Sequence, residues 1–137
     1  MNQTYAETVP VADPPARATV RARLVNPLFS TEIQCVAEES PHRSVVRAEG
    51  QAPGNLPFSP GIDTGSRLYL SGVVGRGGDI TEQTRGALDS IRSTLEAASR
   101  GFGDVEDIWV YLADIRDWES IRRWARDLPT TLGVAGA

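Results

Sequence analysis

The chain has one cysteine and one histidine among its 137 residues. Cys35 therefore cannot form an internal disulfide, and His42 has no cysteine at a metal-ligand spacing, so we expect no metal site. The chain also lacks an apolar run near the roughly 18–20 residues that span a bilayer, and it does not open like a signal peptide. We therefore expect a cytoplasmic location and no membrane partner.

Positive charge is also scarce. The 14 Lys and Arg residues are outnumbered by 18 Asp and Glu residues, which gives a formal net charge of −4. Proteins that bind the phosphate backbone of nucleic acids concentrate Lys and Arg, because binding depends on counterion release. Nucleic acid is thus not an expected partner, and ribonuclease activity is disfavoured for the same reason.

The front of the chain predicts a short helix followed by a β-hairpin. With 40% hydrophobic and 23% charged residues, the whole chain has the composition of one compact domain. Residues 1–9 form a helical stub that Pro10 ends. Residues 17–24 and 31–37 alternate apolar and polar side chains with the period of a strand, and Asn26–Pro27 supplies the turn between them.

The middle of the chain predicts a connection and a strand. Residues 38–57 are charged at first and then rich in Gly, Pro and Asn, which is typical of a surface loop, with a short strand signal at 44–47. Residues 67–74 are apolar and β-prone, so we place a buried strand there.

The rear of the chain predicts a helix, a strand and a second helix. Apolar residues recur three and four apart over 80–99, Asp79 and Glu82 have the spacing of a capping box, and Gly101 is the expected stop. Residues 105–113 are β-prone, and residues 118–128 trace one face of a second helix. The tail from residue 130 reads as frayed.

Several stretches resemble the RidA (YjgF/YER057c) family of imine and enamine deaminases. LPFSPGIDTGSRLYLSG (56–72) is similar to the opening of that family, DITEQTRGALDSIRSTLEAAS (79–99) to its first helix, and DVEDIWVYLADIRDW (104–118) to the strand that follows. PPARATVRARL (14–24) and TEIQCVA (31–37) resemble its closing strands, although here they come first. The chain therefore resembles a circularly permuted member.

The resemblance implies an α+β fold like that of chorismate mutase, with a six-stranded mixed sheet and two helices packed on one face, circularly permuted. The whole chain, 1–137, would be a single domain. Residues 1–40 match the C-terminal part of the family and residues 58–128 its N-terminal part, while 41–57 hold the joining linker and first strand and 129–137 are a tail. Most family members are trimers, so a homotrimer with sites between subunits is implied.

Two residues carry the implied chemistry. Arg17 opens the front strand, and its planar fork suits the carboxylate of a small 2-imino or 2-keto acid. On sequence alone the commoner alternative is an exposed strand residue in a surface ion pair, and the resemblance favours the ligand-binding role. Glu32 follows at the spacing the family has between its arginine and its site glutamate. A carboxylate there would orient water or donate a proton, and the alternative is a polar residue on the solvent face.

Four further residues are implied to line the substrate site. Ser71 and Gly72 would present backbone groups, although a glycine at a strand end also marks a bulge. Thr19 lies on the same strand face as Arg17 and would contribute its backbone. Phe58 stands where many active relatives have Tyr, so an aromatic wall is kept and a hydroxyl is lost.

The implied function is hydrolysis of reactive 2-imino or 2-enamino acids to 2-keto acids and ammonia, with no cofactor. The alternative is a binding or regulatory module that keeps Arg17 without turnover. The stub over 1–9 resembles part of the family's second helix, as does the stretch around Arg122. It is either redundant sequence or a replacement for that helix in its own or a neighbouring subunit.

Overall fold

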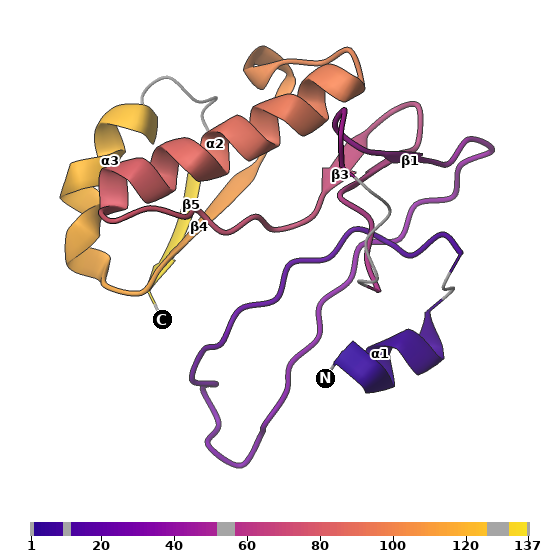
Figure 1. Cartoon of the computed structure of the whole chain (residues 1–137). Helices are drawn as coiled ribbons and strands as arrows, with labels where there is room; N and C mark the ends of the chain where they lie inside the picture. Colours follow the sequence, from indigo (N-terminus) through magenta and orange to yellow (C-terminus); the bar gives the residue numbers. More distant parts are fainter. Residues whose placement is uncertain (1, 10–11, 52–56, 126–131, 137) are drawn as a thin grey trace.

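The computed structural model describes residues 2–9, 12–51, 57–125 and 132–136 (Figure 1). Its elements in chain order are α1 (Asn2–Thr8), β1 (Ser44–Val46), β2 (Gly61–Asp63), β3 (Leu68–Leu70), α2 (Ile80–Ala97), β4 (Ile108–Leu112), α3 (Trp118–Ala125) and β5 (Leu132–Gly136). Two single-turn 3-10 helices, Phe102–Asp104 and Ile115–Asp117, flank β4. The α+β class predicted from the sequence is confirmed.

The strands of the described residues form two separate sheets rather than one of six strands. β1, β2 and β3 pair antiparallel in that order, with Val45 opposite Ile62 and Ile62 opposite Tyr69. β4 and β5 pair in parallel. The strand signals at 44–47 and 67–74 are confirmed at β1 and β3. Strand β2 was missed because its three residues are too few to show alternation.

Helix α2 confirms the clearest prediction of the sequence. The Asp79 side chain accepts a hydrogen bond from the Glu82 N–H at 2.8 Å, as an N-cap does. The predicted stop at Gly101 is wrong. Ser99 takes the left-handed conformation (φ 55°), and the Arg100 N–H donates to the Leu95 carbonyl at 2.9 Å, which closes the helix two residues earlier.

The rear of the chain is more regular than its sequence suggests. β4 lies inside the strand predicted over 105–113, and α3 begins at Trp118 as predicted, although its predicted end at 128 lies outside the described residues. The frayed tail is wrong, because β5 pairs with the whole of β4. A parallel partner satisfies backbone N–H and C=O groups of β4 through the main chain, which the local sequence of the tail does not reveal.

A small core joins these elements. Its buried apolar side chains are Val46, Ile62, Leu95, Leu112 and Ile121. Figure 1 shows α2 crossing in front of β4 and β5, with α3 beside the first turns of α2. No helix within the described residues has the length and apolar character needed to cross a bilayer.

Residues 19–37 form an extended arm that projects from the rest of the chain (Figure 1). The predicted turn is present, since the Phe29 N–H donates to the Asn26 carbonyl at 3.1 Å, but the strands predicted on either side of it are not formed. Alternation tells which face of a strand can be buried, whereas strand formation also needs a paired neighbour. In this structure neither half of the arm has that pairing.

Large apolar side chains are exposed along the arm. They are Val20, Val25, Leu28, Phe29, Ile33 and Val36. The two ends of the arm are nevertheless anchored, because Asp13 in the segment before it forms an ion pair with Arg43 in the segment after it. The circular permutation itself stays a prediction, since it concerns how the chain order compares with that of relatives.

Candidate functional site

The segment that enters the arm docks against the turn before β2. Ser59, which is fully buried, donates its hydroxyl to the Pro14 carbonyl at 2.6 Å and its N–H to the Pro15 carbonyl at 3.0 Å. Proline has no N–H of its own, so these two carbonyls are the groups this stretch offers for docking. The contact brings the front of the chain beside the start of the predicted site.

Arg17 is held at the end of β3 by its own backbone. Its N–H donates to the Ser71 hydroxyl at 2.8 Å, and the Gly72 N–H donates to the Arg17 carbonyl at 3.1 Å. Ser71 in turn donates its hydroxyl to the Ser59 carbonyl at 2.6 Å. A Cβ on Gly72 would lie 3.0 Å from the Cβ of Ala18, so glycine permits this close approach of two chain segments.

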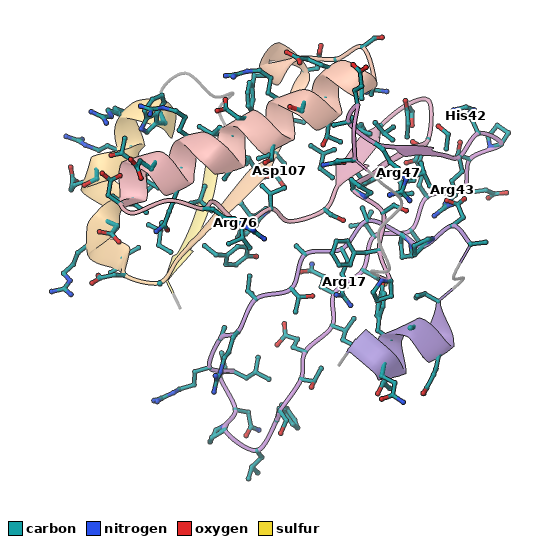
Figure 2. The ribbon with its side chains drawn as sticks, in the orientation of Figure 1. Arg17, His42, Arg43, Arg47, Arg76 and Asp107 are labelled. Carbon is teal, nitrogen blue, oxygen red and sulfur yellow. The ribbon has the colours of Figure 1, made fainter. Side chains whose placement is uncertain are left out.

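The Arg17 guanidinium lies against two aromatic rings. Its central carbon is 4.5 Å from the ring centroid of Tyr5 on α1 and 4.9 Å from that of Phe58. Both distances are within the range of a favourable cation–π contact. Figure 2 shows Arg17 between the front segment and α1, on the side of the molecule away from α2 and α3.

Four of the six predicted site residues thus meet, and two do not. Arg17, Phe58, Ser71 and Gly72 are joined by the contacts above. Thr19 and Glu32 are exposed on the arm, and the hairpin that was to bring Glu32 back beside Arg17 is not formed.

The roles of Ser71 and Gly72 differ from the expectation that their backbone faces a ligand. The Ser71 N–H donates to the Pro60 carbonyl at 2.8 Å, and the Gly72 N–H is engaged with Arg17. The Gly72 N–H therefore holds the Arg17 backbone, while both donors of Ser71 bond to the turn before β2 and its hydroxyl oxygen accepts from the Arg17 N–H. A ligand at this site would meet the Arg17 side chain and the aromatic rings first.

Two residues of the site were missed from the sequence. Tyr5 lies in the stub that was set apart as a duplicated helix fragment, and its aromatic side chain was the available signal. Ser59 sits in the Phe-Ser-Pro stretch beside a residue that was singled out. Nothing in its type or spacing distinguishes a buried structural serine from an exposed one.

The segment that leaves the arm is anchored by Glu38. Its carboxylate accepts hydrogen bonds from the hydroxyls of Ser66, Thr64 and Tyr69, the last at 2.9 Å. These bonds favour the ionised form, and the pKa of Glu38 is lowered from 4.5, mainly by the Ser66 hydroxyl and next by Tyr69. Glu38 is therefore engaged in fixing the chain to the β2–β3 turn.

The charged group of the assembled site is the Arg17 guanidinium. Within the part of the chain that the structure describes, no three His, Cys, Asp or Glu side chains cluster as a metal site would require. Arg17 supplies a permanent positive charge, half-buried between apolar ring faces. A small planar carboxylate matches both the charge and the planar fork of a guanidinium.

The chain is similar in sequence to known proteins. The family model described as Endoribonuclease L-PSP matches residues 49–131. A RutC family protein of Saccharolobus solfataricus is 38% identical over 73 residues, which are 46% of this chain and 56% of that protein. The 2-iminobutanoate/2-iminopropanoate deaminase of Escherichia coli is 27% identical over 82 residues, 54% of this chain and 64% of that protein. The chain thus matches about three fifths of the length of these relatives.

The fold is shared with solved structures. The crystal structure of E. coli TdcF with bound serine superimposes with a TM-score of 0.62 at 18% sequence identity, covering 69% of this chain and 85% of that one. At this identity the likeness shows the fold.

Proposed function

Because the chain belongs to the Endoribonuclease L-PSP family, the RidA/YjgF/YER057c family that its motifs resemble, we propose that it hydrolyses small 2-imino acids to 2-keto acids and ammonia. The observation that carries the proposal is the placement of Arg17 at Ser71 and Gly72 with its guanidinium against aromatic rings. A relative named as a 2-iminobutanoate/2-iminopropanoate deaminase and a fold neighbour named with bound serine support a small carboxylate ligand.

Arg17 would anchor the substrate. Two N–H groups of its fork would donate to the two carboxylate oxygens, which fixes the position of the adjacent imine carbon. Phe58 would form one wall of the cleft and exclude water from that side. The imine carbon is already electrophilic, so the reaction needs no cofactor.

Glu32 would supply the acid–base step. Its carboxylate would take a proton from water as the water oxygen bonds to the imine carbon and pass it to the imine nitrogen, which gives a carbinolamine. It would then take the hydroxyl proton as the C=O bond forms and pass it to the nitrogen as the C–N bond breaks and ammonia leaves. The balance is one imine and one water giving one 2-keto acid and one ammonia. Since Glu32 lies exposed on the arm, the step requires the arm to close over Arg17 or over the site of a neighbouring copy.

A binding module without turnover is the second candidate. The observation that favours it is the same exposure of Glu32, together with the loss of a hydroxyl at Phe58. Such a protein would bind 2-keto acids at Arg17 and leave imines to hydrolyse at their uncatalysed rate. The two candidates share a binding site and differ in the acid–base group.

An assay that generates 2-iminobutanoate in solution separates them. We expect ammonia release above the buffer rate, and a loss of about 10²- to 10⁴-fold in kcat for Glu32→Gln, the usual contribution of a general acid–base group. Glu39→Gln is the matched control, since Glu39 is also exposed on the extended chain and has no proposed role. A wild-type rate equal to buffer, with 2-ketobutanoate still bound, would decide for the binding module.

We also propose that the protein is a homotrimer with sites shared between copies. The arm exposes apolar side chains, and Trp109 and Tyr111 on β4 are 60% and 48% exposed. Extended apolar surface of this kind marks protein interfaces. Light scattering should give a mass about three times that of the 14.8 kDa chain; a monomer mass at micromolar concentration would overturn the proposal.

A further inference from the structure

Tyr5 contacts the side chain on which the proposed function depends. It belongs to α1, a helix of seven residues, and its ring centroid lies 4.5 Å from the central carbon of the Arg17 guanidinium. Phe58 contacts the same group at 4.9 Å from a different part of the chain. Two aromatic residues separated by 53 positions in sequence therefore converge on one cation.

These contacts restrict the orientation of a flexible side chain. An arginine has four rotatable bonds and loses considerable rotamer freedom when it grips a ligand. Aromatic rings attract a guanidinium over their faces, whereas the guanidinium binds a carboxylate through N–H groups in its own plane. The two kinds of contact use different directions, so ring contact and carboxylate binding are compatible.

We propose that Tyr5 is a positioning residue of the carboxylate site, holding the Arg17 guanidinium with Phe58 so that its fork is oriented before the ligand arrives. The proposal rests on the proposed function. Ordering the side chain in advance lowers the entropy lost on binding, which raises affinity without a direct contact to the ligand. It also gives α1 a role: the stub carries one of the two rings that orient Arg17.

The test compares Tyr5→Phe with Tyr5→Leu. Phenylalanine keeps the aromatic face and leucine keeps apolar bulk without it. For binding of 2-ketobutanoate measured by calorimetry, we expect a Kd within about twofold of wild type for Tyr5→Phe and a five- to tenfold weaker Kd for Tyr5→Leu. A Tyr5→Leu protein that binds as wild type would overturn the proposal. Equal weakening in both variants would also overturn it, because the hydroxyl and not the ring would then matter.

A second readout does not depend on any ligand. The ¹⁵N heteronuclear NOE of the Arg17 Nε–H group, assigned by its loss in Arg17→Ala, reports how rigid the guanidinium is on the ps–ns timescale. We expect a high value in wild type and Tyr5→Phe and a lower one in Tyr5→Leu. If Arg17 is rigid in wild type and more mobile in Tyr5→Leu but the wild type does not bind 2-ketobutanoate, the proposed function is wrong and the role of Tyr5 stands. If Arg17 is equally mobile in all three proteins, Tyr5 does not position it, and the proposed function is unaffected.

Discussion

Arg17→Ala is expected to lower kcat/KM for 2-iminobutanoate by about 10²- to 10⁴-fold and to remove measurable binding of 2-ketobutanoate. A hydrogen bond to a charged group contributes about 1.5–3 kcal/mol, and a bidentate guanidinium–carboxylate pair makes two of them. The measurements are initial rates of ammonia release and calorimetric titration.

Arg17→Lys is the matched control. Lysine keeps the positive charge but presents a single ammonium group in place of a planar fork. We expect it to fall between wild type and Arg17→Ala. If Arg17→Ala retains the wild-type rate, the carboxylate is held elsewhere and the proposed site is wrong. If Arg17→Lys equals wild type, charge alone suffices and the fork has no part in recognition.

Leu95→Ala is expected to lower the free energy of unfolding by about 2–5 kcal/mol. Leu95 is 4% exposed and lies near the end of α2 in the small core, so truncation leaves a cavity that a core of few side chains cannot fill by collapse. The measurement is urea denaturation followed by far-UV circular dichroism.

Leu28→Ala makes the same chemical change on the arm. Leu28 is 87% exposed, so the loss should stay within about 0.5 kcal/mol if the arm remains in solvent. A loss near that of Leu95→Ala, rising with protein concentration, would place the arm in an interface between copies. A small effect of Leu95→Ala would contradict the core as described.

The sequence predicted best those features that are local. Helix α2 follows from the spacing of its apolar residues and from the capping pair at Asp79 and Glu82, all within one short stretch. The approach of Arg17 to Ser71 was reached through a family resemblance. It spans 54 positions, and no local pattern encodes it.

The predictions that were wrong concern features that depend on contacts between distant parts of the chain. The two segments of the arm alternate apolar and polar residues as strands do. A strand is stabilised by hydrogen bonds to a neighbouring strand, however, and the residues of one segment do not determine whether that neighbour is present. Residues 132–136 show the opposite case. Their sequence gives a weak strand signal, yet they form β5 because β4 pairs with them. The contact of Tyr5 with Arg17 could not be predicted because a cation–π contact has no fixed spacing in sequence.

The long separation between Arg17 and Ser71 has a consequence for biosynthesis. Residues are added at roughly 5–20 per second, so the 54 positions take roughly 3–11 s to translate. Throughout that interval the front segment has left the peptidyl-transferase centre while its docking partner does not yet exist. The apolar side chains between Val20 and Val36 are then exposed on the nascent chain, and the backbone of Arg17 can be fixed only after Ser71 and Gly72 have been added.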